Sequence, residues 1–363
     1  MAGVQAQTTP GLQVELVEDL ELLREDWSAL GARTGNLFAT WEWNSLWWQE
    51  MGRGRRLLTA AVRDDGGALV GLLPAYLAFA AGPVRMIRLL GRGQGDRLGP
   101  ICMPADRLRV SSALGAALRS KPWTNALLLA EQLPAEEGWR GLLGAHPVSR
   151  EASPVLELTT SDWDEFLAGR SANFRQQVRS RERRLARDHD MRYRLIEDAD
   201  ALPGALDTLF GLHGARWGEE GAPEFGLAQG FHRAFAACAH ARGWLRLWLL
   251  EVDGHTVAAW HGFRFGGADW YYQSGRDPAW DRQSVGAVLL AHTIRDCVEA
   301  GIPRYLLLRG DEAYKQRFAT ADPGLETVAV GSGLGGRAAM AALAGMRRLP
   351  PARRQRIARV LGA

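Results

Sequence analysis

The chain has 363 residues, of which 47% are hydrophobic, and this is enough to form the cores of two domains of ordinary size. Its formal net charge is only +3, from 44 basic and 41 acidic residues, so overall charge gives no reason to expect DNA as a partner. Three cysteines, Cys102, Cys238 and Cys297, form no CxxC pair and have no neighbouring histidine pair; this predicts buried thiols in a reducing compartment and no metal site.

The first domain is predicted to span residues 12–152. Residues 1–11 lack the charged start and apolar run of a signal peptide, so we expect a disordered N-terminus and a cytoplasmic protein. A strand over 12–17 and a helix over 19–30 follow. Four tryptophans between Trp41 and Trp48 are spread around a further helix, which favours core packing over an aromatic binding site.

A hairpin and a glycine-rich loop characterise the rest of this domain. Asp64-Asp65-Gly66-Gly67 separates two strand-like runs and predicts the hairpin turn. The loop of residues 91–99 lacks the lysine of a P-loop, so a turn-rich connection is favoured over phosphate binding. Strands over 85–90 and 125–129 and helices over 106–119 and 136–143 complete the domain, with a boundary at residues 151–154.

The second domain, residues 153–331, begins with a strand and two helices. The helix after Ser171 carries many arginines, and two interpretations remain open: a solvated helix face, or a cationic surface that meets an anionic donor or acceptor. A strand over 191–197 and helices over 202–217 and 227–242 come next. Three antiparallel strands then lead to residue 274.

A strand, helix and strand between Trp270 and Phe318 are typical of a βαβ crossover, whose two strands lie parallel and close together. The helix is expected to open at Ser284, with the serine side chain as its cap, and the second strand to span Arg304–Leu308. Gly286 would let a phosphate approach the backbone N–H groups of the first helical turn.

A strand over 325–330 is expected to close the second domain. The remaining tail, residues 332–363, has seven arginines and no acid and predicts two short amphipathic helices. Contact with an anionic membrane surface and packing against an acidic face of the protein are both open. The order of elements predicts an α/β fold of mixed sheets in two tandem units, each a mixed central sheet flanked by helices.

Several short motifs occur in a characteristic order along nearly the whole chain. They are Trp41, Trp47 and Trp48, Gly71-Leu72-Leu73-Pro74, Gly91 with Asp96, His213 with Arg216-Trp217, Gln273-Ser274-Gly275 with Asp277-Pro278, Gly286, and Gly310-Asp311-Glu312-Ala313-Tyr314-Lys315. In these motifs the chain resembles the GNAT acyltransferase superfamily. It is most similar to the CelD/BcsL-like branch, which is related to the FemABX aminoacyltransferases and has two GNAT-like units in tandem.

The resemblance implies that acetyl-CoA or another acyl-CoA lies between the last meander strand and the crossover strand, with its pyrophosphate at the crossover helix. The expected contacts are Gln283, Ser284, Val285 and Gly286, although Val288 stands where the family has a small residue. Gln273, Ser274 and Gly275 are expected to offer backbone N–H groups to the tetrahedral oxyanion.

The resemblance also implies roles for side chains around the crossover. Tyr314 is placed like the tyrosine that protonates the departing thiolate, and the alternative is a hydroxyl that only fixes the loop. His261 is a candidate base, against a structural role on its strand. Asp311 is a second candidate base, and Lys315 would pair with a phosphate or with Asp311.

Acceptor contacts are expected from Trp217, Glu219 and Asp277, with Glu219 and Glu220 as further candidate bases. The helical insertion between residues 202 and 242 would shape the acceptor cavity.

The leading functional hypothesis is an acyl-CoA-dependent N-acyltransferase that acts on an amino sugar, an amino acid or a peptide-like amine. One alternative is FemABX-like transfer from an aminoacyl-tRNA, favoured by the arginine-rich helix alone. The other alternative is a non-catalytic accessory protein in polysaccharide biosynthesis, favoured by Val288 and by the absence of an acid in Tyr305–Leu308.

Overall fold

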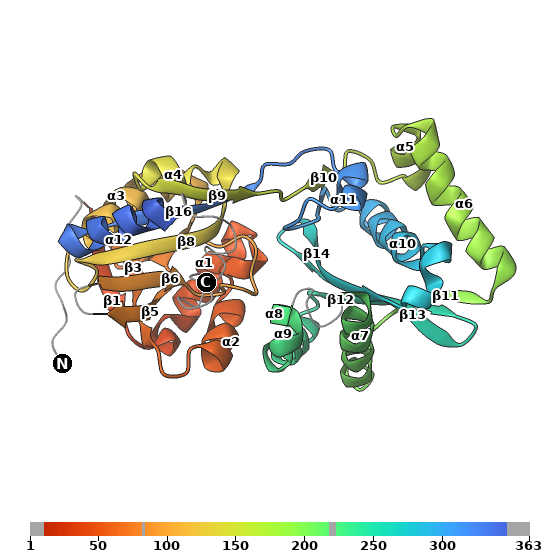
Figure 1. Ribbon diagram of the computed structural model, residues 1–363, viewed down its shortest axis with the longest axis horizontal. Coiled ribbons are helices and arrows are strands. Elements are labelled where there is room, and N and C mark those ends of the chain that lie inside the picture. The colour runs from red at the N-terminus through yellow and green to blue at the C-terminus, as the bar shows by residue number, and fades with distance from the viewer. Residues whose placement is uncertain (1–10, 82–83, 218–222, 347–363) are drawn as a thin grey trace. The chain divides into compact units, whose positions relative to one another are not determined.

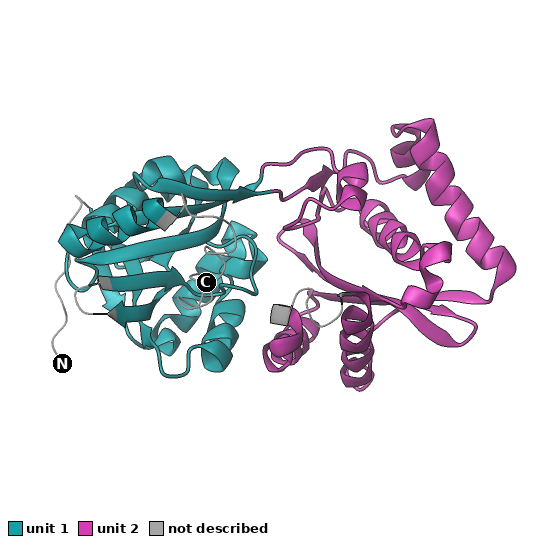
Figure 2. Ribbon diagram, viewed as in Figure 1, with its two compact units in different colours: residues 1–151, 324–363 teal, residues 152–323 magenta. Residues whose placement is uncertain are grey.

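The computed structural model describes residues 11–81, 84–217 and 223–346, and the chain divides into two compact units (Figures 1 and 2). Unit 1 comprises Met1–Glu151 and Gly324–Ala363, and unit 2 comprises Ala152–Pro323. The expectations for residues 1–10 and for the tail beyond residue 346 lie outside the described residues. Both units are mixed α/β structures, so the predicted fold class is confirmed.

Unit 1 contains an antiparallel sheet and a larger mixed sheet, with helices packed around them. Its sheets have the strand orders β1-β3-β4-β7 and β2-β5-β6-β8-β16-β9. The elements are β1 (Leu12–Val17), α1 (Arg24–Thr34), α2 (Trp41–Met51), β2 (Arg56–Leu57), β3 (Thr59–Asp64), β4 (Leu69–Leu73), β5 (Ala75–Ala81), β6 (Val84–Leu89), β7 (Ile101–Cys102), α3 (Arg107–Leu118), β8 (Ala126–Pro134), α4 (Trp139–Leu142), β9 (His146–Glu151), β16 (Leu325–Gly331) and α12 (Gly333–Met346).

The strand expected to close the second domain belongs to unit 1 instead. β16 pairs antiparallel with both β8 and β9, so it lies between them in the larger sheet. Alternating apolar residues predict a strand but do not identify its partners, which here lie about half the chain away. The tail that follows forms α12, whose Ala339, Met340 and Leu343 pack against the cluster around Leu127 and Leu129.

The tryptophan-rich helix α2 is a core element, as its spacing predicted. Trp43 and Trp47 are 0% and 2% exposed, and the Trp47 indole N–H donates to the Arg92 carbonyl at 3.1 Å. The glycine-rich loop packs against this helix. A Cβ added at Gly91 would lie 3.0 Å from Leu98 Cδ2 and 3.1 Å from Trp43 Nε1, so close packing accounts for this glycine.

Unit 2 contains one sheet of order β10-β15-β14-β13-β12-β11, in which β14 and β15 form the parallel pair. Its elements are β10 (Val155–Glu157), α5 (Trp163–Ala168), α6 (Ala172–Asp188), β11 (Met191–Leu195), α7 (Leu202–Trp217), α8 (Pro223–Leu227), α9 (Gln229–Ala241), β12 (Leu245–Val252), β13 (His255–Phe265), β14 (Ala268–Arg276), α10 (Val285–Glu299), β15 (Arg304–Leu306) and α11 (Ala313–Phe318).

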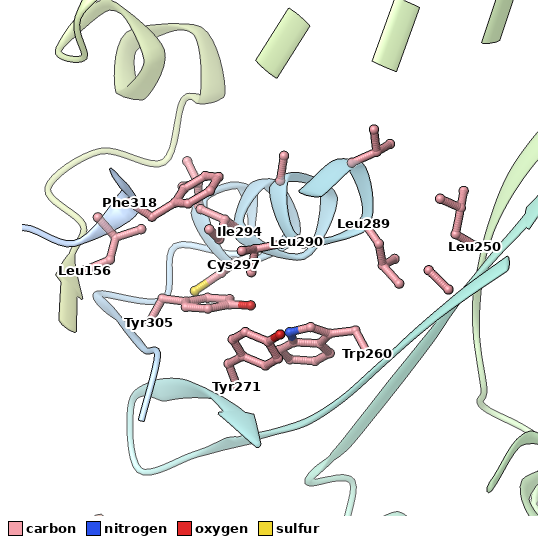
Figure 3. Packing of buried hydrophobic residues seen from close by; sticks show 14 of the residues in the cluster. Leu156, Leu250, Trp260, Tyr271, Leu289, Leu290, Ile294, Cys297, Tyr305 and Phe318 are labelled. Carbon is pink, nitrogen blue, oxygen red and sulfur yellow. The ribbon is translucent and has the colours of Figure 1, made fainter. Parts of the chain in front are cut away.

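The core of unit 2 forms between α10 and the sheet. Figure 3 shows side chains of α10, including Leu290 and Ile294, pointing toward the rings of Trp260, Tyr271 and Tyr305. The Tyr305 hydroxyl lies 2.8 Å from Thr293 Oγ1, so this buried phenol is satisfied by the crossover helix itself.

The two strands of the crossover stay together only briefly. β14 pairs with β15 from Ala268 to Trp270, and β14 then continues to Arg276 while β15 ends at Leu306. The strand expected through Leu308 is therefore shorter, and Leu308 adopts a left-handed backbone with φ of 56°. This divergence opens the sheet beside Tyr271.

No helix among the described residues is long and apolar enough to span a membrane.

Candidate functional site

A cavity of about 370 Å³ opens in unit 2 where β14 and β15 diverge. Its walls come from the first half of α6, the end of α7, the middle of β13, the end of β14, the turn before α10, the start of α10, and α11. Phe174 of α6 and Phe318 of α11 meet edge to face with ring centroids 5.0 Å apart and form an apolar part of the wall. The cavity therefore lies where the crossover leads us to expect a donor.

Four polar side chains form a connected network along one side of this cavity. The Tyr271 hydroxyl lies 2.6 Å from Ser274 Oγ and 3.2 Å from the Tyr314 hydroxyl. Arg216 of α7 donates to Ser274 Oγ at 2.8 Å, and its guanidinium lies 5.9 Å from the centre of the Tyr314 ring. Two phenols, one hydroxyl and one guanidinium thus converge on the cavity.

Gly275 explains how α7 brings Arg216 to this network. A Cβ at Gly275 would lie 2.4 Å from the His213 backbone nitrogen and 2.6 Å from the Leu212 carbonyl carbon. The helix backbone therefore rests directly on the strand, and Arg216 follows one turn later on the same helix. Gly275 also lines the cavity, where it was predicted to bind the donor. In addition, its missing side chain lets α7 pack against β14.

Tyr314 stays protonated and Arg216 stays charged in this network. Burial raises the pKa of Tyr314, and the neighbouring Tyr271 raises it further, while Arg216 acts in the opposite direction. Burial alone would lower the pKa of Arg216, but the phenol oxygens of Tyr271 and Tyr314 outweigh this and raise it. At neutral pH, Tyr314 is therefore a neutral hydrogen-bond donor and Arg216 a cation.

The cavity wall is strongly basic. Arg181, Arg216, Arg276 and Arg317 all line it, against one carboxylate, Asp281, which is ion-paired with Arg276. Burial lowers the pKa of Arg181, and the nearby Arg317 lowers it further because the two charges have the same sign. Such a surplus of guanidinium groups favours an anionic ligand.

The start of α10 differs from its prediction. Ser284 has a left-handed backbone, with φ of 57° and ψ of 39°, and its side chain makes no capping hydrogen bond. Its carbonyl instead accepts from the N–H groups of Ala287 and Val288 at 2.9 and 3.1 Å. The serine preference at this position rests on an extended backbone, which a left-handed residue does not have.

Of the residues expected at this helix start, Ser284 and Gly286 line the cavity. A Cβ at Gly286 would lie 3.2 Å from Arg276 Cδ, so the glycine leaves room for the arginine side chain. Val285 is fully buried in the core, and Gln283 is not among the lining residues. Val288, which departs from the family pattern, lines the cavity.

Several predicted catalytic residues lie elsewhere. His261 on β13 is 1% exposed and contacts the rings of Phe263 and Tyr272, and burial lowers its pKa to about 3. Lys315 Nζ donates to the Arg309 carbonyl and lies 3.1 Å from Glu312 Oε2, which makes Glu312 its carboxylate partner. Asp311 is exposed and is not part of the cavity lining.

The expected acceptor and oxyanion residues are also spread out. Asp277 Oδ1 accepts from the Ala279 N–H at 2.9 Å and caps the short helical turn before α10. Gln273 is paired with His261 across the strands and does not line the cavity. Trp217 ends α7 without a described side chain, and Glu219 and Glu220 lie outside the described residues.

Sequence reasoning missed most of the residues that make the cavity polar. Tyr271 and Arg317 received no site role, and Arg181 was considered only as part of the arginine-rich helix after Ser171. Arg216 had the clearest signal, because it belongs to the His213 to Trp217 motif on which the resemblance rests. Within the described ranges, no group of three His, Cys, Asp or Glu side chains is arranged to hold a metal ion.

Comparison with known proteins finds a family match in the segment around this cavity. Residues 172–316 match the model of the family described as acetyltransferase (GNAT) domain. A search of curated proteins found no match to the chain.

Three solved structures show the same fold over most of the chain. FemX matches with a TM-score of 0.61 and 12% identity, over 88% of this chain and 98% of its own. The C-terminal domain of a putative lysylphosphatidylglycerol synthetase from Agrobacterium fabrum has a TM-score of 0.53 and 13% identity, over 89% and 96%. A conserved protein of unknown function from Bacteroides thetaiotaomicron has a TM-score of 0.51 and 14% identity, over 87% of this chain and 99% of its own. The GNAT-domain match over residues 172–316 and the FemX-like fold confirm the predicted resemblance.

Proposed function

We propose that this protein is an acyl-CoA-dependent N-acyltransferase whose acceptor is an amine of an amino sugar, an amino acid or a peptide-like molecule, and the match of residues 172–316 to the acetyltransferase (GNAT) domain supports this. One observation carries the proposal: the basic cavity opens between the diverging crossover strands and contains the Tyr314, Tyr271, Ser274 and Arg216 network.

The charges of the cavity suit the phosphates of a CoA donor. Arg181 and Arg317 supply guanidinium groups on the α6 and α11 side. The N–H groups of Val285 and Gly286 begin α10, where the helix dipole adds partial positive charge. Many nucleotide sites bind phosphate oxygens through arginine side chains and the N–H groups of a helix start. This cavity offers both kinds of donor.

Tyr314 is the proposed hydrogen-bond donor to the departing sulfur. Amine attack on the thioester carbonyl gives a tetrahedral oxyanion, whose collapse breaks the C–S bond; the nitrogen loses one proton to solvent and the departing thiolate gains one, so the products are an amide and a free thiol. A phenol whose pKa is raised by burial remains protonated, so Tyr314 can donate to this sulfur throughout the reaction. Arg216 lies over the Tyr314 ring and stabilises the same negative charge.

The acceptor amine must be uncharged when it attacks. Among the described lining residues there is no histidine, and the one carboxylate, Asp281, is paired with Arg276. Nearby guanidinium groups lower the pKa of an amine because like charges disfavour its protonated form. The basic wall therefore favours a neutral amine even without a base in the cavity, and Asp311, which lies outside the lining, remains a candidate base.

A second candidate function is aminoacyl transfer from a tRNA. It is favoured by the FemX fold and by exposed arginines on α6, including Arg179, Arg183 and Arg187. Two of these are already ion-paired, Arg179 with Asp164 and Arg187 with Asp188, which lowers the charge they offer to a nucleic acid. If tRNA is the donor, Arg179→Ala, Arg183→Ala and Arg187→Ala should weaken activity strongly, with a steep dependence on salt.

Isothermal titration calorimetry with acetyl-CoA and longer acyl-CoAs tests the leading proposal. We expect saturable binding that Gly286→Trp abolishes, because the indole would enter the space now taken by Arg276 at the helix start. Gly204→Trp is the matched control, since Gly204 is an exposed helical glycine with nothing within 4 Å of its added Cβ.

Absence of acyl-CoA binding to the unmodified protein would remove the leading proposal. The accessory role in polysaccharide biosynthesis would then be the stronger candidate if the protein bound glycan but transferred no acyl group. Retained affinity in Gly286→Trp would place the donor elsewhere in the molecule.

A further inference from the structure

A second group of arginines gathers on the larger sheet of unit 1, where β5, β6 and β8 run side by side (Figure 1). Tyr76 and Arg88 are directly opposite each other in β5 and β6, and Glu131 lies on β8. Arg92 follows β6, and Arg55 precedes β2. These five residues are called the arginine cluster below.

One carboxylate serves two guanidinium groups in the arginine cluster. Arg88 Nη1 donates to both oxygens of Glu131 at 3.2 and 3.3 Å, and Arg92 Nε lies 2.7 Å from Glu131 Oε2. A third guanidinium, that of Arg55, donates to the Tyr76 hydroxyl at 3.0 Å and lies 5.1 Å from the centre of the Tyr76 ring. Three cations therefore share a single anion among the described contacts.

The arginine cluster has a buried floor and an accessible rim. Arg88 and Tyr76 are each 1% exposed, whereas the side chains of Arg92 and Glu131 are 22% and 21% exposed and Arg55 is exposed. Burial lowers the pKa of Arg88, Glu131 opposes this, and Arg92 and Arg55 add to the lowering. Arg92 and Arg55 thus add positive charge around Arg88, whereas one arginine and one glutamate would suffice for a structural pair.

Surplus positive charge at a partly buried site is unfavourable unless an anion balances it. The surplus here is two charges, and guanidinium groups match the geometry of phosphate oxygens through paired N–H donors. We propose that the arginine cluster binds a phosphate dianion, either inorganic phosphate or the terminal group of a phosphorylated small molecule. This site lies in unit 1 and rests on no assumption about the acyl donor of unit 2.

The test is calorimetric titration with inorganic phosphate near pH 8, where phosphate is largely dianionic, at constant ionic strength. Arg181→Gln/Arg317→Gln serves as the background protein, so that the basic cavity of unit 2 contributes little. We expect one saturable site in this background. Adding Arg55→Gln and Arg92→Gln should weaken phosphate binding by about tenfold or more, because hydrogen bonds between charged groups are lost.

Three comparisons make the result specific. Arg140→Gln is the matched control, because Arg140 is an exposed arginine of unit 1 with its own partner, Glu326, and this variant should bind phosphate unchanged. Arg92→Lys keeps the charge but loses the paired donors, and should bind with intermediate affinity. Glycerol 2-phosphate in place of phosphate distinguishes the sources: tighter binding of the monoester identifies a phosphorylated small molecule, and tighter binding of phosphate identifies the inorganic ion.

The proposal is overturned if the background protein shows no saturable phosphate binding, or if acetate binds as tightly as phosphate. It is also overturned if Arg55→Gln/Arg92→Gln, folded by circular dichroism, binds phosphate as the background protein does. Both substituted side chains lie at the accessible rim, so the buried Arg88–Glu131 pair remains intact in these variants.

Discussion

The two units contain the same crossover but use the space at its end differently. In unit 1, β6 and β8 pair in parallel from Arg85 with Ala126 to Arg88 with Leu129, and α3 lies in the connection between them. The loop after β6 then returns to β8, where the Leu98 N–H donates to the Gln132 carbonyl at 3.0 Å. The cavity that Leu98 lines measures only about 50 Å³.

In the part of unit 2 that the structure describes, no such loop fills the gap between the strands. β14 and β15 diverge after Trp270, and a cavity of about 370 Å³ remains, with arginines in its wall. The comparison teaches that the crossover alone does not make a donor site. A loop that returns to the strand end can close the gap, and its absence in unit 2 leaves an opening that an acyl donor can enter.

The largest expected difference between the units is their response to acid. Burial lowers the pKa of His261 to about 3 and that of His213 to about 4, and His232 is lowered in the same direction, all in unit 2. These histidines bind protons in the unfolded chain below a pKa of about 6.5 but stay neutral in the folded unit. Stability is therefore complete above that value and falls as the pH drops toward 4.

At pH 5, His261 and His213 should each destabilise unit 2 by about 2 kcal/mol, and His232 should add to this loss in the same direction. Hydrogen exchange during urea unfolding, recorded at pH 7 and at pH 5, measures the free energy of unfolding of each unit. Unit 1 should change less, because its described residues include none of these three histidines. Equal losses in both units would contradict this account of the buried cluster.

The next largest effect is expected at Gly275. A Cβ there would lie 2.4 Å from the backbone of α7, so Gly275→Val should push α7 away, destabilise unit 2 by about 3 kcal/mol and displace Arg216. Denaturant unfolding measures the loss, and Gly211→Val on α7 is the control because nothing lies within 4 Å of its added Cβ. Equal stability of the two variants would show that α7 does not rest on the strand.

A pair of truncations compares the two gaps directly. Leu98→Ala removes a 5% exposed side chain from the filled gap of unit 1 and should destabilise the protein by about 2 kcal/mol. Val288→Ala lies beside the existing cavity of unit 2 and should destabilise it by only about 1 kcal/mol while enlarging the donor space. Denaturant midpoints measure both changes. A larger loss for Val288→Ala would mean that the unit 2 cavity is closed in solution.

The smallest expected effect concerns Tyr314. Tyr314→Phe keeps the ring but removes the donor to the departing sulfur, and should lower kcat by about tenfold or more with little change in KM. Steady-state kinetics with the preferred acyl-CoA measures this. Phe318→Leu is a useful companion, because it alters the apolar wall without touching the network and should raise KM instead. An unchanged kcat in Tyr314→Phe would show that the Tyr314 hydroxyl does not assist the departing sulfur and only holds the loop in place.

Much of the fold could be predicted from local patterns. The crossover, the tryptophan-rich helix and the hairpin turns each follow from spacing or turn chemistry within a short segment. The position of β16 could not, because pairing with β8 and β9 depends on residues far away in the sequence. Ser284 illustrates a second limit: its residue type favours an N-cap, but its left-handed backbone prevents the side chain from acting as one.

The cavity lies at the predicted crossover, but much of its lining was not predicted. Gly286, Ser274, Gly275 and Tyr314 line the cavity because they lie on the crossover itself, whose geometry is local. Arg181, Arg216 and Arg317 come from three different helices, and only tertiary packing brings them together. His261 has the chemistry of a base but lies on a buried strand, and a sequence does not reveal which face of that strand meets the cavity.

The number of acyl-CoA molecules bound per chain tests the central contrast most directly. The account predicts one tight site for acetyl-CoA or a longer acyl-CoA by calorimetry, in unit 2. Arg181→Gln/Arg317→Gln should weaken this site by about tenfold or more, since two charge-assisted contacts are lost. Two equivalent sites, no site, or a single site that is indifferent to these substitutions would contradict the claim that the open gap of unit 2 holds the donor.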